Sequence, residues 1–345
     1  MSPQFKSSLA VVFALLALPL ILAAQTKPDR PPWAQPPSSQ PSPSPTPPTE
    51  PPVNPTDTQE TPDNKQNPRT TMKVSTDLVN VLVSVLDDHN RPAPNLPVEA
   101  FKIYEEGVLQ KIDVFEQETK QPLDIALMID ASLSARADKS AEEDAAAHFI
   151  QQVLRPDDRL NVFSIDEVVT ELLPYYSSKV SALQDAVRRM PEGAGTSLYD
   201  ALVLGSQSLQ KQYGERRRVI ILVTDAGETT SHYDFETARK ASLRAGILLY
   251  TIVIRPVKNE NGRNTAGEHA LQTITETTGG AMFFPQSPQE LPMIFDRIDS
   301  ELRTQYRLAY YPNPRGPANT YRTIEVKVLP GYTARHRTTY FTGPR

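Results

Sequence analysis

The sequence contains no cysteine among its 345 residues. This absence excludes disulfide bonds, thiolate nucleophiles and zinc sites built from cysteine ligands. It also argues against a lipid anchor, which in bacteria needs a cysteine directly after the signal sequence. A chain of this length can bury enough apolar surface to fold without disulfides, so the lack of cysteine does not conflict with a stable, exported fold.

Concentrated charge of one sign is also missing. The chain carries 36 Lys and Arg residues and 41 Asp and Glu residues, which gives a net charge of -5. Without a basic stripe we expect no nucleic-acid partner. Neither a Gly-x-Gly-x-x-Gly motif nor a P-loop occurs, which disfavours nucleotide binding. The histidines are dispersed without the spacing of metal ligands, so we expect solvated or structural roles for His89, His148, His232, His269 and His336.

Long hydrophobic runs are absent except near the start of the chain. Lys6 precedes an apolar stretch over residues 9–22, and Ala23 and Ala24 follow. A charged start, a short apolar core and small residues predict a secretory signal peptide over residues 1–24, cleaved near Ala24. An uncleaved anchor is the alternative. No other stretch is long enough to cross a bilayer. We therefore expect export to the periplasm, the cell surface or the medium.

A polar linker follows the predicted signal peptide. From Pro28 to Pro68 the chain consists largely of Pro, Ser, Thr, Gln and Asn, with almost no aliphatic residues. Such a segment cannot bury enough apolar area to offset its ordering entropy. We predict a disordered spacer over residues 25–70. A ligand for a proline-recognising domain is the alternative.

Two β-rich segments lie at residues 71–120 and 305–345. The first contains an alternating apolar strand at 77–86, a turn cluster at 87–94 and a hairpin with strands at 101–105 and 110–117 around Glu106 and Gly107. The second contains strand-like stretches at 306–311, 321–329 and 335–341. Neither group alone makes a well-buried sheet. We expect the two segments to form one small β-sandwich. Its tyrosines, Tyr306, Tyr310, Tyr311 and Tyr321, are expected to pack inside it, and a contact surface is the alternative.

The central residues, 121–304, alternate between strands and helices. Apolar runs predict strands at 123–129, 159–165, 218–224, 247–254 and 281–284, with an edge strand at 168–174. Helical spacing predicts helices at 142–154, 181–190, 198–210, 235–245, 270–278 and 291–302. Repeated β-α units predict an α/β fold with a doubly wound, mostly parallel sheet flanked by helices, inserted between the two β-segments. We expect Arg216, Arg217 and Arg218 to form a solvated cluster before their strand.

Oxygen-bearing side chains gather in three loops of this central part. They are Asp130, Ser132 and Ser134 after one strand, Thr196 before a helix, and Asp225 after another strand. In a parallel sheet these loops meet at the carboxyl edge. Carboxylates and hydroxyls suit Mg²⁺, and Gly193 and Gly195 allow close backbone approach. Helix capping and loop hydrogen bonding are the structural alternatives. For Glu228 we expect a solvent-facing position, and contact with the metal region through water is the alternative.

The pattern Asp-x-Ser-x-Ser, then Thr, then Asp resembles the metal ion-dependent adhesion site of von Willebrand factor type A domains. The resemblance covers residues 123–304, and it implies direct metal ligation by Ser132 and Ser134. It implies direct or water-mediated ligation by Thr196, and action largely through water for Asp130 and Asp225. Ala226 departs from the pattern, because a glycine commonly follows the second Asp. The flanking residues 78–86, 101–105 and 310–311 resemble the related domain that is typical of acidobacterial exported proteins.

A functional expectation follows from the charges of this site. The two carboxylates just balance the charge of a divalent cation. The other ligands are neutral hydroxyls and waters, so the metal stays electrophilic. An acidic side chain of a partner protein can then complete the coordination shell. We therefore expect Mg²⁺, or Mn²⁺ or Ca²⁺, and metal-dependent protein or matrix adhesion rather than catalysis. The alternatives are a metal-dependent hydrolase and a structural envelope protein with a vestigial site.

Overall fold

The computed structural model describes residues 78–343 except 118–119, 133–138, 192 and 255–263. The predicted signal peptide (1–24) and linker (25–70) lie outside the described residues. Thr71–Arg345 form one compact unit. Within the described ranges, no helix is both long and apolar enough to cross a membrane.

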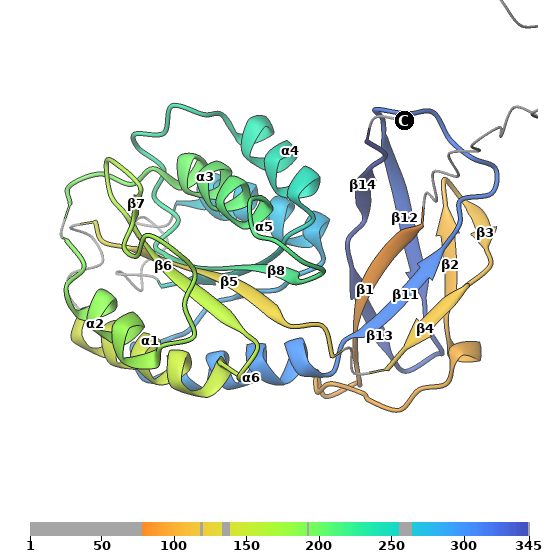
Figure 1. The fold of residues 1–345 in the computed structure, drawn as a ribbon, viewed down its shortest axis with the longest axis horizontal. Coiled ribbons are helices and arrows are strands. Elements are labelled where there is room, and N and C mark those ends of the chain that lie inside the picture. Colours follow the sequence, from red (N-terminus) through yellow and green to blue (C-terminus); the bar gives the residue numbers. More distant parts are fainter. Residues whose placement is uncertain (1–77, 118–119, 133–138, 192, 255–263, 344–345) are drawn as a thin grey trace, which may run out of the picture. The chain divides into compact units, whose positions relative to one another are not determined.

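The centre of the α/β part is a six-stranded sheet with the order β10-β9-β8-β5-β6-β7 (Figure 1). All neighbours are parallel except β7, which is antiparallel to β6. The strands are β5 (Leu123–Asp130), β6 (Arg159–Ile165), β7 (Thr170–Glu171), β8 (Arg217–Thr224), β9 (Leu248–Val253) and β10 (Met282–Phe283). Helices cover both faces of the sheet, which confirms the predicted doubly wound fold.

Two sets of helices enclose the sheet. One core contains side chains of α1 (Lys139–Val153), α2 (Val180–Arg188) and α6 (Leu291–Arg303), and the other contains α3 (Leu198–Gln210), α4 (Phe235–Ala245) and α5 (Thr265–Thr278). Phe149 of α1 stacks on Phe295 of α6 with ring centroids 4.6 Å apart. The side chain of Asp234 caps α4, and the left-handed Gly246 follows its last residue, so this helix has the predicted bounds 235–245. Short 3-10 turns occur at Val98–Ala100 and Pro288–Glu290.

The flanking segments form two four-stranded antiparallel sheets, ordered β13-β1-β11-β4 and β14-β12-β2-β3 (Figure 1). The strands are β1 (Val79–Leu86), β2 (Lys102–Glu105), β3 (Val108–Gln110), β4 (Val114–Glu116), β11 (Tyr306–Tyr310), β12 (Tyr321–Lys327), β13 (Thr333–His336) and β14 (Thr339–Phe341). Strand β1 lies between β11 and β13, so the amino-terminal segment completes a sheet of the carboxyl-terminal one. This pairing confirms the predicted sandwich.

Two predicted strands are wrong in extent, because each divides between the two sheets. Residues 110–117 split into the end of β3, which pairs with β2, and β4, which pairs with β11 of the other sheet. Residues 335–341 likewise split between β13 and β14. A strand of uninterrupted hydrogen bonds stays in one sheet. The breaks at these points let each short apolar stretch face the common core from its own side.

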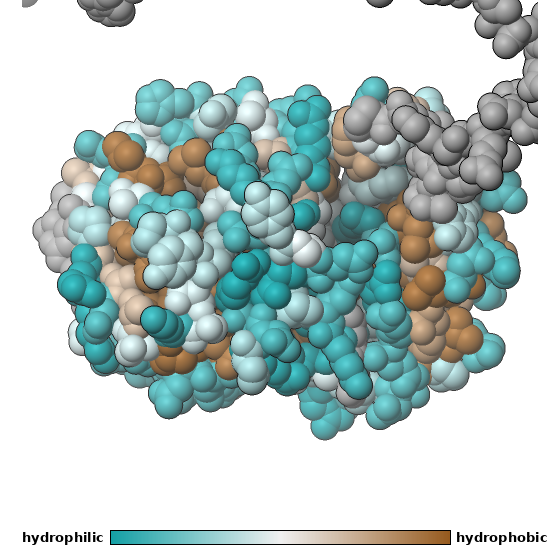
Figure 2. Space-filling model, viewed as in Figure 1, coloured by the Kyte–Doolittle hydropathy of each residue, from teal (hydrophilic) through white to brown (hydrophobic). Residues whose placement is uncertain are grey.

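The predicted turn at Glu106 and Gly107 is confirmed, since both have positive φ angles of 49° and 78°. Tyr306 and Tyr310 are buried in the sandwich core, as expected, but Tyr311 is 50% exposed because it follows the end of β11. Exposed Val108 and Leu109 belong to the edge strand β3. Figure 2 shows hydrophobic residues on this side of the sandwich, within an otherwise mostly hydrophilic face.

The predicted solvated arginine cluster is wrong. Arg217 is 4% exposed and donates to the backbone carbonyls of Gln121 (3.1 Å) and Leu302. Arg216 forms an ion pair with the buried Asp124 at 2.7 Å. The beginning of β8 meets the end of α6, where the last helical carbonyls lack intrahelical partners, and the guanidinium group of Arg217 donates to one of them.

Candidate metal centre

The predicted ligands converge where parallel strands end. Strands β5 and β8 are neighbours in register, with Ile129 opposite Val223, so their following residues leave the sheet side by side. Asp130 is the last residue of β5, and Asp225 follows the last residue of β8. Thr196 lies two residues before α3. This edge of the sheet is where ligands bind in open α/β folds.

Asp130 is the centre of the hydrogen-bond network. It is 3% exposed. Its Oδ1 accepts from the Ser132 N–H at 3.1 Å and from the Thr196 hydroxyl at 3.4 Å, and its Oδ2 accepts from the Thr224 hydroxyl at 2.7 Å. Ser132 and Thr196 are themselves buried. The Asp130 carboxylate thus joins its own loop to the Thr196 loop. Its bond to Thr224, the residue before Asp225, joins it to the third loop.

The electrostatics of this carboxylate favour a cation. Burial raises the pKa of Asp130 to about 6, against the lowering effect of hydrogen bonds from Thr224 and Ser132, and the nearby Asp225 carboxylate adds to the rise. Within the described part of the chain, no Lys, Arg or His forms an ion pair with Asp130 or Asp225. A buried charge without a counterion is costly. A divalent ion beside the two carboxylates would remove that cost, so this donor set fits such an ion.

Ser134, the third predicted ligand on the first loop, lies outside the described residues. Asp225 is half-buried, and its Oδ1 accepts from the Gly227 N–H at 2.8 Å. The structure therefore places four of the five predicted residues at one sheet edge. Asp130, Ser132 and Thr196 are linked by hydrogen bonds, and Asp225 acts on Asp130 through its charge.

Backbone contacts fix the position of the Thr196 loop. The Thr196 N–H donates to the Thr229 hydroxyl at 2.8 Å, and the Thr196 carbonyl accepts from the Thr229 N–H at 3.0 Å. Gly193 donates its N–H to the Ala131 carbonyl at 3.1 Å. A Cβ at Gly193 would lie 2.0 Å from Cβ of Asp166. The predicted close approach at Gly193 is therefore confirmed, because a side chain there would collide with Asp166 after β6. The hydrogen bond to Ala131 joins the second loop to the first.

Two supporting residues were missed by sequence reasoning. Thr224 holds Asp130 and also accepts from the Ala226 N–H at 3.0 Å. The expectation that Glu228 faces solvent is wrong. Its carboxylate accepts from the Leu198 N–H at 2.8 Å and from the Ser231 hydroxyl at 2.7 Å. Glu228 thereby supplies the cap that the α3 terminus lacks locally. A threonine closing an apolar strand was the signal for Thr224, whereas no local signal marks Glu228.

The departure at Ala226 has a backbone consequence. Its φ angle is 64°, in the left-handed region that glycine adopts most easily. The side chain itself is fully buried. The carbonyl oxygen of Ala226 lies 2.1 Å from the place where a Cβ would stand on Gly267, in the first turn of α5. The loop after Asp225 is therefore pressed against α5, and Gly267 is needed for that approach.

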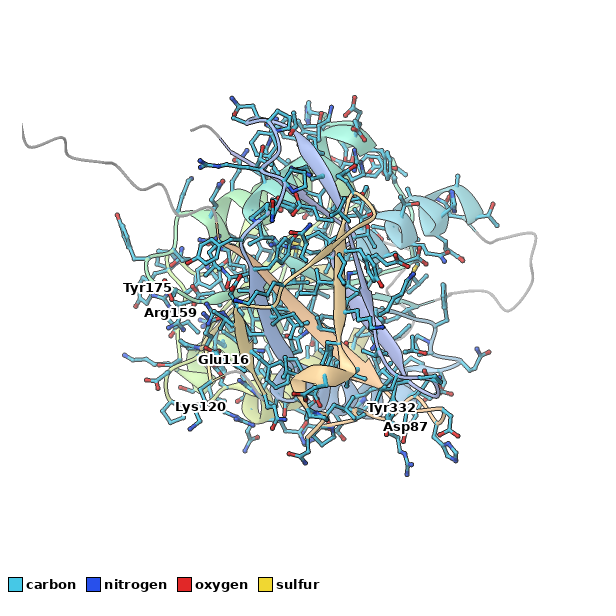
Figure 3. All side chains as sticks on the ribbon, turned by 90° about the vertical axis from the view of Figure 1, so that its right-hand side faces the viewer. Asp87, Glu116, Lys120, Arg159, Tyr175 and Tyr332 are labelled. Atoms are coloured by element: carbon cyan, nitrogen blue, oxygen red, sulfur yellow. The ribbon has the colours of Figure 1, made fainter. Side chains whose placement is uncertain are left out.

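A second group of possible metal ligands occurs in the turn predicted at 87–94. Asp87, Asp88 and His89 bring ligand atoms within 4.8 Å of one another, but Asp88 and His89 are exposed. Asp87 already forms an ion pair with Arg91, with 2.8 Å between Oδ2 of Asp87 and Nη2 of Arg91. Figure 3 shows Asp87 beside Tyr332, in agreement with the pairing of β1 with β13. These contacts explain the turn without an ion.

Comparison with known proteins defines the family. The model of the von Willebrand factor type A domain matches residues 124–297. This match covers half of the chain, so the protein belongs to the von Willebrand factor type A domain family. No curated protein matches the chain.

Solved structures with a similar fold share little sequence. A von Willebrand factor type A protein from Catenulispora acidiphila is 12% identical, with a TM-score of 0.47, and the match covers 77% of this chain and 74% of that one. Proximal thread matrix protein 1 from the mussel byssus, solved with a zinc-occupied adhesion-site motif, is 17% identical, with a TM-score of 0.45 and coverages of 57% and 49%. The type V pili tip protein Mfa5 from Porphyromonas gingivalis is 13% identical, with a TM-score of 0.42 and coverages of 52% and 95%.

Proposed function

We propose that the protein binds one divalent cation at the edge formed by β5, β8 and the loop before α3, and uses it to hold a partner protein. The ligands are Asp130, Ser132, Ser134, Thr196 and Asp225, and the expected ion is Mg²⁺, with Mn²⁺ or Ca²⁺ as substitutes. The observation that carries the proposal is the buried Asp130 carboxylate, which has a second acid nearby and no cationic partner in the described chain.

The same charges support an adhesive role. Two carboxylates balance a divalent ion, so an open coordination position attracts an acidic side chain from outside. Such a contact is desolvated and charge-assisted, and can anchor an interface. We propose an acidic protein or matrix partner, and no catalytic step. This proposal includes export of the protein. It also includes the division into a signal peptide (1–24), a linker (25–70), β-segments (71–120 and 305–345) and a central domain (121–304).

Calorimetry on the full chain tests the metal. Titration with MgCl₂ and MnCl₂ should give one saturable site, which Asp130→Ala abolishes. Asp88→Ala, which removes an exposed acid of the 87–94 turn, serves as the matched control and should leave the site unchanged. Absence of binding by the unaltered chain would overturn the proposal and favour a vestigial site.

A pull-down from envelope extract tests the adhesive role. Partners should be retained with Mg²⁺ and lost with chelator or with Asp130→Ala. Equal retention in all conditions contradicts a metal-mediated contact. Metal-dependent turnover of generic esters or phosphoesters that Asp130→Ala abolishes would instead support the hydrolase alternative.

A further inference from the structure

A second polar site lies far from the candidate metal centre. A cavity of about 530 Å³ is lined by residues at the beginnings of β8 and β9 and by residues of the sandwich strands. The metal centre, by contrast, lies at the ends of β5 and β8. All described lining residues belong to the compact unit Thr71–Arg345. A cavity of this volume is in the range of small-molecule sites, roughly 300–1,000 Å³.

The lining is strongly basic. Its arginines are Arg216, Arg217, Arg218, Arg307, Arg322 and Arg337. Glu215, which is exposed, is the single acid among the described lining residues. Three of the arginines are neutralised by carboxylates at N···O distances of 2.6 or 2.7 Å: Arg216 by Asp124, Arg307 by Glu116 and Arg322 by Glu105.

The other three arginines contact only neutral groups within the described part of the chain. Arg217 donates to two backbone carbonyls and to the Gln305 side chain. Arg218 donates to the Ala245 carbonyl at 2.9 Å, and Arg337 donates to the Asn80 carbonyl. The nearby Asp158 carboxylate acts on the charge of Arg217, whereas Arg218 and Arg337 have no carboxylate partner among the described residues.

Unused hydrogen-bond donors accompany this charge. Nε of Arg337 and Nη1 of Arg322 are buried and have no hydrogen-bond partner in the described structure. Burial also lowers the pKa of Arg337, and lowers the pKa of Arg217 to about 10. Guanidinium groups that are partly desolvated and short of acceptors gain most from an anion with several oxygen atoms.

We propose that this cavity binds a small organic anion with carboxylate or phosphate groups, held by Arg218, Arg322 and Arg337. Planar guanidinium groups match the paired oxygens of both kinds of anion. The ring of Tyr340, which also lines the cavity, and the neighbouring Phe341 provide an apolar wall for the body of the ligand. The alternative is that the arginines only join the sandwich to the strand ends through carbonyls.

Calorimetry with citrate and with inorganic phosphate separates the two possibilities. The full chain is first stripped of metal with EDTA and then dialysed until the EDTA is removed, so that neither the metal centre nor the chelator contributes. Sodium chloride at matched ionic strength is the reference. We expect saturable binding of at least one anion with a Kd below about 1 mM. The tighter of the two anions identifies the chemical group. No saturable binding beyond the chloride reference overturns the proposal.

Variants locate the anion. Arg337→Gln and Arg218→Gln should each weaken binding at least about tenfold, which is about 1.4 kcal/mol. If Arg337→Gln does not fold, the half-buried Arg218 carries the test. Arg188→Gln, which removes an exposed arginine of α2, is the matched control and should bind like the unaltered chain. Unchanged binding by Arg218→Gln and by every folded Arg337→Gln sample would overturn the assignment.

Discussion

The Thr224 hydroxyl donates to Oδ2 of Asp130 across 2.7 Å, from the last residue of β8 to the last residue of β5. This bond aims one carboxylate oxygen back at the sheet and leaves Oδ1 toward Ser132 and Thr196. The orientation of the Asp130 carboxylate therefore depends on Thr224, which is not one of the predicted ligands.

Thr224→Val tests this dependence. Valine keeps the shape but removes the donor to Asp130 and the acceptor for the Ala226 N–H. We expect Mn²⁺ affinity to fall about tenfold and stability to fall by about 1–3 kcal/mol. Calorimetry and urea denaturation measure the two effects. Thr251→Val, which removes a hydroxyl bonded to Thr275 instead, should lower stability without changing affinity. Unchanged Mn²⁺ affinity in Thr224→Val would show that the bond does not position the acid.

The packing of α5 on the loop after Asp225 gives a second prediction. Gly267→Ala places a Cβ 2.1 Å from the Ala226 carbonyl, so helix and loop must separate. We expect a loss of more than about 2 kcal/mol in unfolding free energy, together with weaker metal binding. Ala266→Gly, at the exposed neighbouring position, should cost less than about 1 kcal/mol. Equal losses in the two variants would contradict the close approach.

Ala226→Gly should be nearly neutral, because opposing effects cancel. Glycine relieves about 1–2 kcal/mol of left-handed strain. It also loses a buried methyl group, about 0.8 kcal/mol, and gains about 0.4–1 kcal/mol of unfolded-chain entropy. Urea denaturation should therefore show a change within about 1 kcal/mol. A larger loss of unfolding free energy would mean that packing of the Ala226 methyl group contributes more than the burial of its apolar area.

His336 gives a pH-dependent prediction. Its Nδ1–H donates to the Arg337 carbonyl at 2.9 Å, and its Nε2 accepts from the Val326 N–H at 3.0 Å, so the ring is neutral in the fold. Burial lowers the pKa of His336 below 6.5, while the nearby Glu325 opposes the shift. The folded state thus binds fewer protons than the unfolded state, and this contribution to stability is lost as the pH falls below 6.5.

Urea denaturation at pH 7.5 and pH 5.0 measures the effect. The unaltered chain should lose stability relative to His336→Gln on acidification. Comparison with the variant is needed because Asp130, whose pKa is raised to about 6, acts in the opposite direction over the same range. His148→Gln, at an exposed position, should follow the unaltered chain. Parallel curves for the unaltered chain and His336→Gln would refute the prediction.

Glu301 connects three elements of the fold. It is 1% exposed, accepts from the Tyr250 hydroxyl at 3.0 Å, and forms an ion pair with Arg335 of β13. Glu301→Leu should cost about 3–5 kcal/mol, because Arg335 and Tyr250 lose their acceptor. The double variant with Arg335→Met should be more stable than the sum of the single variants by at least about 1 kcal/mol. Additive losses in urea denaturation would exclude the coupling.

Local patterns predicted the elements well where burial repeats at a regular interval. The helix at 198–210 has the predicted bounds, because its apolar residues follow helical spacing up to the buried Leu209. The start of α5 was predicted five residues too late, since its first turn depends on the cap from Asn264 rather than on apolar residues. The two divided strands were missed because alternation does not indicate which sheet a strand joins.

Contacts between distant residues explain what the sequence did not reveal. Arg217 reaches Gln305 from 88 positions away, and Glu228 caps a helix that begins 30 residues earlier. No window of local sequence contains both partners of such contacts. The positions of the proposed metal ligands were predictable for the opposite reason. Each follows a recognisable strand or precedes a helix, so the parallel arrangement alone brings them to one edge.

The insertion of the α/β part has a mechanical consequence. The chain leaves the sandwich after β4 and returns at β11, and these two strands are hydrogen-bonded neighbours. A force applied at the candidate metal centre is therefore transmitted to the sandwich through two adjacent strands at once. Strand β1 lies on the other side of β11 and carries the amino-terminal connection. Tension between a bound partner and the amino terminus would act on β11 through its hydrogen bonds to both β1 and β4. The force would run along the strands and shear these hydrogen bonds together, instead of breaking them one at a time from a sheet edge.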